Sequence, residues 1–218
     1  MPLKGVIFDM DGVLCDSEPF IYLAAKQMFM ETYGVDPEKE DFAAGVGAGE
    51  DRYLGVVAEK YGVRLEFPRD KTRTYDIYLE IIRGKLPPLP GVGDFVSLCR
   101  ERGLRLAVAS SADRVKVTGN LREIGLASGT FDAVLSGDQV ARKKPDPEIF
   151  LAAAARLGLS AADCLVVEDA PNGIRAGKSA GSACLGLTTS FDSTTLLSAG
   201  ADWIAQNLAH ADLAQMGG

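Results

Sequence analysis

The sequence has 218 residues and a formal net charge of −7, and hydrophobic residues make up 47% of it. This is typical of a globular chain with one large domain, or a core with a modest second domain. No basic stripe and no bilayer-long apolar run occurs, so neither nucleic acid nor a membrane is expected as a partner, and we expect a monomer. The four cysteines are scattered without a C-x-x-C pair, which argues against a disulfide framework or a structural zinc site and favours a reducing cytoplasm.

The chain begins with a short apolar run at residues 4–8, which ends at Asp9 and predicts a buried strand. From residue 17 to residue 86, apolar side chains recur at helical spacing with no strand-like alternation. This region therefore predicts a small bundle of helices. Three prolines and a glycine at residues 87–91 then form a stiff break, which indicates a linker.

After the linker, short apolar runs alternate with helical stretches, in the βαβ rhythm of a parallel sheet covered on both faces. These runs lie at residues 104–109, 131–135, 164–167 and 183–187, and a last short helix is expected in the tail. The first strand belongs with them. We therefore predict an α/β fold: a Rossmann-like, doubly wound core of residues 1–16 and 88–218, with residues 17–87 inserted as an α-helical cap domain.

The acidic end of the first strand is the strongest chemical signal, because Asp9 and Asp11 are followed there by Gly12. Residues i and i+2 of a strand share a face, so both carboxylates can point into one site. Parallel sheets bind ligands at the carboxyl ends of their strands, and hard oxygen ligands suit Mg²⁺. The alternative is a strand capped by surface aspartates, which an isolated D-x-D pair fits equally well.

The second predicted strand ends at Ser110 and Ser111, just before a helix. A hydroxyl together with free backbone N–H groups at a helix N-terminus forms a phosphate site, although an ordinary capping serine fits the same residues. Arg114 follows, either as a bidentate donor to a phosphate or as a solvated helix charge. Taken alone, this segment favours the plain cap.

Two further strand ends carry charged residues. Lys144 precedes a proline and is placed to neutralise charge between a nucleophile and a phosphoryl group, with Lys143 as the adjacent competitor. The fourth strand ends at Glu168 and Asp169, which would complete a metal site begun by Asp9 on a neighbouring strand. Each segment alone also fits helix capping or surface charge. Four of them, each at the end of a predicted strand, indicate one shared site.

These segments resemble the four motifs of the haloacid dehalogenase superfamily: FDMDGVL at residues 8–14, Ser110, KPDP at residues 144–147, and the pair Glu168 and Asp169. The resemblance spans the whole chain, and the helical insertion is similar to the small cap of the β-phosphoglucomutase-like branch. It implies Mg²⁺ as cofactor and phosphoryl transfer through an aspartyl-phosphate. A covalent intermediate of this kind divides one difficult step into two easier ones.

The resemblance also implies a role for each motif residue. Asp9 attacks phosphorus, while Asp11 protonates the leaving oxygen and then activates water. Ser110 and Lys144 hold the phosphoryl oxygens. The metal is held by the side chains of Asp9 and Asp169 and by the backbone carbonyl of Asp11. Glu168 either contacts the ion itself or contacts one of its ligands. The cap would close over this site and exclude water, with hinges near Ser17 and residues 87–90.

The sequence departs from the mutase pattern in the cap. Mutases of this branch carry a histidine twelve residues beyond the nucleophile, where this chain has Ile21, and a cap arginine for the second phosphate. The matching loop at residues 46–50 ends at the acidic Glu50, with Arg52 shortly after it. We therefore predict a phosphatase of a small phosphorylated metabolite, such as a sugar phosphate, with substrate contacts from Glu50, Arg52, Ser111 and Arg114.

Two other classes of function are carried as alternatives. One is a hexose phosphomutase, which would need a phosphate clamp in the cap. The other is a non-catalytic regulatory domain that keeps the fold. Every motif position of the sequence is intact, which argues against this second alternative.

Overall fold

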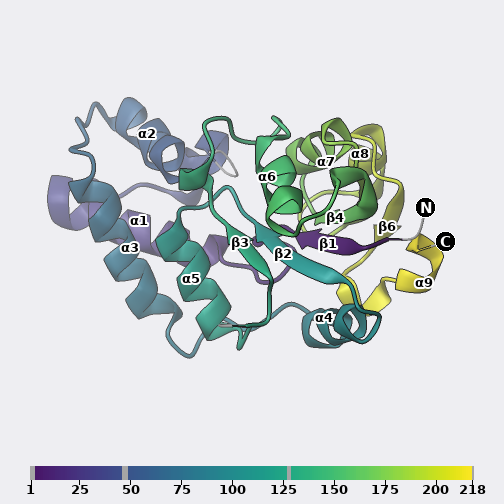
Figure 1. The fold of residues 1–218 in the computed structure, drawn as a ribbon. Helices are drawn as coiled ribbons and strands as arrows, with labels where there is room; N and C mark the ends of the chain where they lie inside the picture. Colours follow the sequence, from purple (N-terminus) through teal and green to yellow (C-terminus); the bar gives the residue numbers. More distant parts are fainter. Residues whose placement is uncertain (1–2, 46–48, 127–128, 218) are drawn as a thin grey trace.

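The computed structural model describes residues 3–45, 49–126 and 129–217. In these residues, six strands form one sheet in the order β3-β2-β1-β4-β5-β6, and every neighbouring pair is parallel (Figure 1). The strands are β1 Gly5–Phe8, β2 Arg105–Ala109, β3 Ala133–Leu135, β4 Cys164–Glu168, β5 Ala183–Leu187 and β6 Trp203–Ala205. The order confirms the predicted doubly wound α/β core, with the first strand at its centre.

The helices form two groups along the chain. The following belong to the first group, before β2: α1 Glu18–Tyr33, α2 Glu50–Tyr61, α3 Arg69–Ile82 and α4 Val92–Glu101. The second group alternates with the later strands: α5 Arg114–Glu123, α6 Glu148–Arg156, α7 Pro171–Ser179, α8 Ser193–Ser198 and α9 Leu213–Met216. Short 3-10 segments are η1 Lys39–Gly45, η2 Gly137–Gln139, η3 Ala161–Asp163 and η4 Leu208–His210. Within the described ranges, no helix has the length and apolarity to cross a membrane.

The sheet is apolar on both faces, because successive side chains along a strand point to opposite faces and those of its strands are apolar in both directions. Val6 and Phe8 of β1 belong to one buried cluster, which includes residues of α4 and α5, while Ile7 belongs to the other, which includes residues of α6, α7 and α8. Figure 1 shows α6, α7 and α8 on one side of the sheet and α4 on the other. The two clusters hold β1 rigidly, so the residue that follows it is placed with little freedom.

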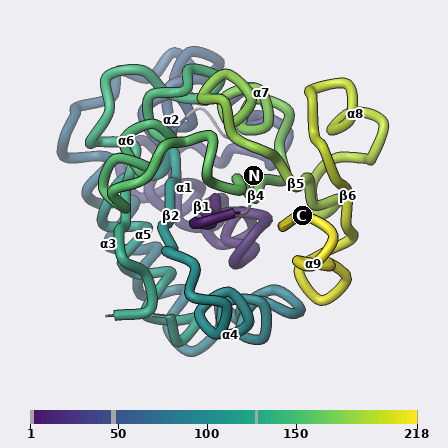
Figure 2. Tube along the Cα trace, turned by 45° about the vertical axis from the view of Figure 1, so that its right-hand side comes forward, coloured from purple at the N-terminus to yellow at the C-terminus, as the bar shows by residue number. Residues whose placement is uncertain are grey.

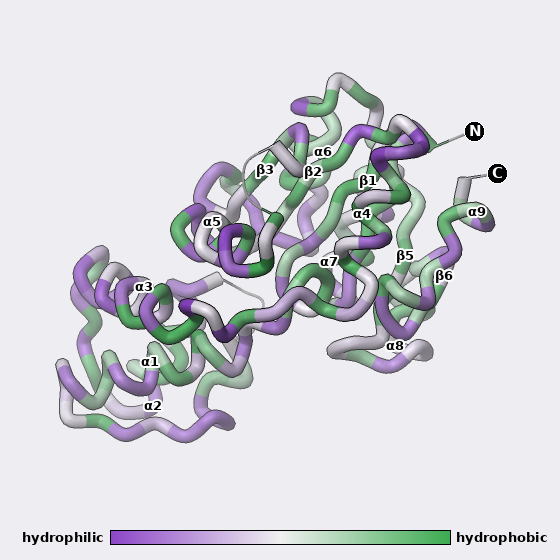
Figure 3. The backbone as a smooth tube through the Cα atoms, turned by 90° about the horizontal axis from the view of Figure 1, so that it is seen from below, coloured by the Kyte–Doolittle hydropathy of each residue, from purple (hydrophilic) through white to green (hydrophobic). Residues whose placement is uncertain are grey.

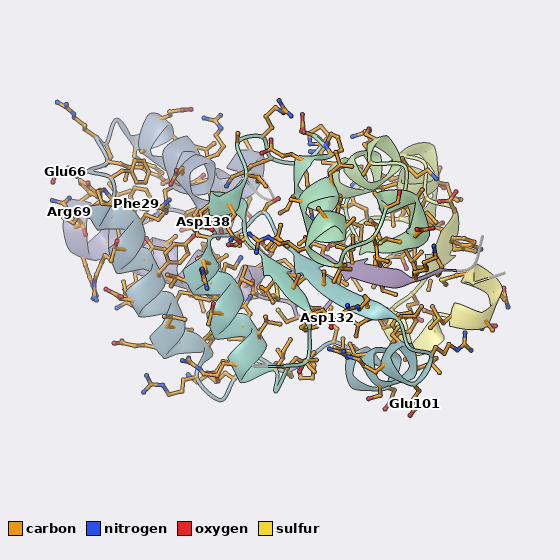
Figure 4. The ribbon with its side chains drawn as sticks, viewed as in Figure 1. Phe29, Glu66, Arg69, Glu101, Asp132 and Asp138 are labelled. Atoms are coloured by element: carbon orange, nitrogen blue, oxygen red, sulfur yellow. The ribbon has the colours of Figure 1, made fainter. Side chains whose placement is uncertain are left out.

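Helices α1, α2 and α3, together with η1, are called the helical cap below. Figure 3 shows them gathered in a lobe beside the sheet. Phe29 is fully buried in this lobe, and the ion pair of Arg69 with Glu66 lies at its outer end (Figure 4). Buried residues of the cap belong to the same apolar cluster as α4 and α5, so the lobe packs onto one face of the core. The domain limits at residues 16–17 and 87–88 stay a prediction.

The predicted elements differ from the observed ones mainly at their ends. Strands β1, β2 and β3 begin later than predicted, and β6 (Trp203–Ala205) was not predicted because three residues give too short an apolar run to recognise. The tail holds a one-turn helix (Leu213–Met216) that follows η4. Leu3 and Leu213 line the same small hollow, and Figure 2 shows the two ends of the chain close together.

Candidate active site

The carboxyl edge of the sheet collects the residues that follow its central strands. Phe8 of β1 is in register with Val108 of β2 and with Val167 of β4, and the backbone N–H of Asp9 donates to the carbonyl of Val167 at 2.9 Å. Asp9, Ser110 and Asp169 therefore emerge side by side. This is the edge at which parallel sheets bind ligands.

A cavity of about 570 Å³ opens at this edge, between the sheet and the helical cap. The core contributes the predicted residues Asp9, Asp11, Ser110, Ser111, Lys144, Glu168 and Asp169 to its lining. The cap contributes Glu18, Ile21, Glu50 and Tyr53. Such a volume is in the usual range for small-molecule sites.

Lys144 lies at the floor of the cavity and contacts two carboxylates. Its Nζ is 2.5 Å from Asp9 Oδ1 and 2.6 Å from Glu168 Oε1, and it also donates to the Ala109 carbonyl at 3.1 Å. Burial lowers the pKa of Lys144, but Asp9 and Glu168 outweigh it and raise the pKa above its ordinary value, so the ammonium is fixed as a cation. The adjacent Lys143 turns elsewhere and donates to the Ser111 carbonyl at 3.2 Å.

Asp9, Glu168 and Asp169 form a buried acidic cluster whose ligand oxygens all lie within 4.8 Å of one another. Burial raises the pKa of Asp9 to about 7, with Glu168 adding to the shift and Lys144 opposing it. Burial, followed by the charges of Glu168 and Asp9, also raises the pKa of Asp169 well above its ordinary value. A divalent cation would offset this crowding of negative charge, and carboxylate oxygens are donors that fit Mg²⁺.

Glu168 is held from two sides. Its Oε1 accepts from Lys144, while its Oε2 accepts from the backbone N–H groups of Asp169 and Ala170, both at 3.0 Å. The carboxylate lies against Gly173 of α7, where an added Cβ would come within 1.8 Å of Oε1. Glu168 is therefore oriented by the start of α7 and in turn orients Lys144.

Asp11 lies at the mouth of the same cavity and has a donor at each oxygen. The Ser17 hydroxyl donates to Oδ1, and Lys116 Nζ lies 3.1 Å from Oδ2. Lys116 also lies 3.7 Å from Glu50 Oε1 of the cap. Burial opposes the charge of Lys116, but Asp11 and Glu50 raise its pKa well above the ordinary value.

Lys116 was not predicted as a site residue, because in the sequence it has the pattern of an ordinary helix lysine. Gly119 was the available signal, because it lies on the same face of α5 three residues later, and glycine within a helix often marks close approach of another helix. Three other lining residues, Glu18, Asn172 and Arg175, were also missed.

The predicted substrate contacts divide into two pairs. Glu50 and Ser111 line the cavity, and Ser110 beside them is buried, with its hydroxyl accepting from the Ala112 N–H at 3.1 Å. Arg52 and Arg114 are not among the lining residues. Arg52 pairs at 2.7 Å with the exposed Glu59.

Arg114 begins α5, where its N–H donates to Asp138 (Figure 4). Residues 46–48, the first three of the predicted cap loop at residues 46–50, lie outside the described residues.

Comparison with known proteins agrees with this geometry. The family profile described as haloacid dehalogenase-like hydrolase matches residues 3–181. The chain is 34% identical over 202 residues to the phosphorylated carbohydrates phosphatase of Thermotoga maritima, covering 91% of this chain and 92% of that protein. It is 32% identical over 195 residues to the β-phosphoglucomutase of Bacillus subtilis, covering 85% and 83%.

One further related protein and one solved structure are also similar to this chain. The chain is 39% identical over 215 residues to the chloroplast protein SUPPRESSOR OF QUENCHING 1 of Arabidopsis thaliana, covering 97% of this chain but only 20% of that protein. The crystal structure of CbbY from Rhodobacter sphaeroides in complex with phosphate superposes with a TM-score of 0.80 at 25% identity, covering 95% of both chains. Motifs, fold and relatives agree, and the chain belongs to the haloacid dehalogenase-like hydrolases.

Proposed function

We propose that this chain is a magnesium-dependent phosphatase that hydrolyses the monoester of a small phosphorylated metabolite, such as a sugar phosphate, through an aspartyl-phosphate on Asp9. One observation carries the proposal: the Lys144 ammonium lies 2.5 Å from Asp9 Oδ1 within a cluster of three buried carboxylates at the floor of the cavity. A cation beside a buried carboxylate suits a nucleophile that must approach an anionic phosphoryl group.

The proposed reaction has two steps. An Asp9 oxygen attacks phosphorus, the bond from phosphorus to the leaving oxygen breaks, and Asp11 gives that oxygen a proton. Asp11 then takes a proton from water, whose oxygen attacks phosphorus and displaces Asp9, releasing inorganic phosphate. Asp11 starts the cycle as a protonated acid and ends it so, while Asp9 starts and ends as a carboxylate, so one water is consumed per ester bond.

The remaining residues hold the reacting groups in place. Ser110 and Lys144 bind the phosphoryl oxygens, while Glu168 fixes Lys144. Asp9, Asp169 and the backbone carbonyl of Asp11 would hold Mg²⁺, which supplies positive charge against the transferring phosphoryl group. Because both oxygens of Glu168 already accept hydrogen bonds, we propose that it does not bind the metal directly but lies beside the residues that do.

The substrate class follows from the relatives and the cavity. The named activity of the Thermotoga maritima relative is on phosphorylated carbohydrates, and that protein matches this chain over nearly its full length. The cap side of the cavity presents Glu18 and Glu50, which suit the hydroxyl groups of a neutral leaving group and oppose a second phosphate. The buried Ile21 likewise leaves no titratable group at its position, so we favour hydrolysis over mutase chemistry.

The test is phosphate release from p-nitrophenyl phosphate and a panel of sugar phosphates, with Mg²⁺ or with EDTA. The wild type should turn over only with Mg²⁺. The variant D9N, with an unchanged melting profile, should lose roughly a thousandfold or more, as removal of a nucleophile does. No turnover of any substrate would refute the proposal, and isomerisation of hexose phosphates faster than their hydrolysis would establish the mutase instead.

We also propose a cytoplasmic, monomeric protein. All four cysteines are free and buried, which suits a reducing compartment. Size-exclusion chromatography with light scattering tests the monomeric state.

A further inference from the structure

We infer that Lys116 is a positioning residue for proton transfer: its ammonium holds the Asp11 side chain at the leaving-group end of the cavity and faces the carboxylate left when Asp11 gives up its proton, and Glu50 contacts it on the cap side. The inference rests on the proposed function, which gives Asp11 the proton transfer. It adds a residue that lies outside the four sequence motifs.

The contacts of Asp11 carry the inference. Lys116 Nζ lies 3.1 Å from Asp11 Oδ2, and the other oxygen accepts from the Ser17 hydroxyl. One donor comes from α5 of the core and the other from the residue just before α1 of the cap. Two donors from separate elements leave the carboxylate little freedom to rotate away from the cavity that it lines.

Lys116 is buried to an extent that is unusual for a lysine. Its side chain is only 4% exposed, and removing an ammonium from water is unfavourable unless close partners offset the loss of hydration. Asp11 at 3.1 Å and Glu50 at 3.7 Å are those partners. Leaving these two partners would leave a buried ammonium without its counter-charges, so the burial favours the observed contact with the acid/base residue.

The cap creates this burial. Gly119 lets α3 approach α5 so closely that a Cβ there would lie 2.4 Å from Leu79 Cδ2. The Tyr78 hydroxyl of α3 donates to Asn120 of α5 at 2.5 Å, and the Tyr78 ring lies 5.9 Å from Lys116 Nζ. The position of Lys116 thus depends on how the cap sits, so the acid/base residue is held only where the cap is seated on α5.

A second lysine provides a matched control. Lys71 of α3 also bridges cap and core, with Nζ at 2.8 Å from Asp51 of α2 and 2.8 Å from Asp113, just before α5. It contacts none of the residues proposed to act on the phosphoryl group. Removing Lys71 therefore tests the loss of a cap–core ion pair alone.

The experiment compares leaving groups. The ratio kcat/KM reports the steps up to transfer of the phosphoryl group to Asp9, and a p-nitrophenolate leaves without a proton whereas an alkoxide needs one. General acid catalysis contributes roughly 10²–10⁴-fold, so D11N should lose that much with an alkyl phosphate and far less with p-nitrophenyl phosphate. K116M should show the same selectivity, with a loss of roughly tenfold to a hundredfold confined to the alkyl substrate.

The controls fix the interpretation. K71M should change kcat/KM by the same factor for both substrates, and K116R should recover part of the alkyl activity because it returns a cation to the site. Should K116M not fold, K116Q, which keeps a donor without the charge, carries the same comparison. An equal loss on both substrates, or no loss, overturns the inference while leaving the phosphatase intact. If D11N itself shows no selectivity, the proton role of Asp11 falls, and the inference with it.

Discussion

Gly12 lies against Asp169 so closely that an added Cβ would come within 1.9 Å of the carboxylate Oδ2. Gly12 also has a φ of +76°, a conformation that other residues rarely adopt. The turn after Asp11 therefore needs glycine for its backbone and for the space it leaves to a proposed metal ligand.

The variant G12A should abolish Mg²⁺-dependent phosphate release, because the methyl group and the carboxylate cannot share the space. Calorimetry should show a parallel loss of Mg²⁺ affinity. The matched control is G34A: Gly34 also has a positive φ of +66°, but nothing lies within 4 Å of its added Cβ. G34A should lose only about 1–2 kcal/mol of stability, the cost of a left-handed backbone in an L-residue, and keep its activity. Full activity in G12A would contradict this assignment.

The glycine at the start of α7 supports a second prediction. An added Cβ at Gly173 would lie 1.8 Å from Glu168 Oε1, so G173A should displace Glu168 and with it Lys144. We expect kcat to fall at least tenfold, measured as phosphate release at saturating substrate. Gly55 lies within α2 with nothing within 4 Å, so G55A should instead raise the free energy of unfolding by about 0.5–1 kcal/mol. Equal behaviour of the two variants would contradict the proposed role of Glu168.

A third prediction concerns pH and Glu18, at the first turn of α1. Burial raises the pKa of Glu18 to about 7, opposed by Lys116 and reinforced by Asp11 and Glu50. A carboxyl whose pKa is raised on folding binds its proton more tightly in the folded state. Its contribution to stability is complete below the ordinary value of 4.5 and is lost as the pH rises through about 7. In EDTA, the melting temperature of the wild type should therefore fall between pH 5 and pH 8, taking roughly these limits from the shift.

The variant E18Q removes this titration and should have a shallower pH dependence of melting. The control is E31Q, because hydrogen bonds from Gln27 and then Arg73 lower the pKa of Glu31, so its titration is complete below this window. An E18Q curve parallel to that of the wild type would show that Glu18 is not the group responsible.

The contact between α3 and α5 gives a fourth prediction. Y78F removes the hydroxyl that donates to Asn120, whose Nδ2 also has no partner among the described residues. Leaving a buried acceptor unsatisfied costs about 1–3 kcal/mol, which chemical denaturation would measure. The hydroxyl of Tyr61 donates at 2.6 Å to Asp41 in an exposed setting, so Y61F should change stability by less than about 0.5 kcal/mol. A neutral Y78F would mean that this bond does not secure the cap.

The sequence could predict the sheet and its acidic edge because both depend on local patterns. Alternating burial of Val6, Ile7 and Phe8 follows from strand geometry, and the carboxyl ends of parallel strands meet at one edge. Asp9, Ser110 and Asp169 were therefore found together at the cavity. Which of Lys143 and Lys144 contacts Asp9 does not follow from a local sequence pattern, because it depends on how the loop before α6 packs.

The cap side of the cavity could not be predicted. Lys116 and Glu18 become buried through contacts between helices distant in sequence, and no pattern along the chain sets the angle between them. Arg52 was expected at the substrate because of its charge, but it lies two residues after the cavity-lining Glu50, on the other side of α2, and pairs with Glu59 instead.

The central place of β1 has a consequence for how the molecule is assembled during synthesis. The neighbours of β1 begin at Arg105 and Cys164, so during synthesis β1 stays unpaired until the cap helices, α4 and then β2 have been made. Its closing contacts are long in sequence, which slows folding and leaves an apolar segment exposed to misassociation. A truncated chain that ends before β4 lacks Glu168 and Asp169, so the acidic cluster can form only after β4 and the residue that follows it have been made.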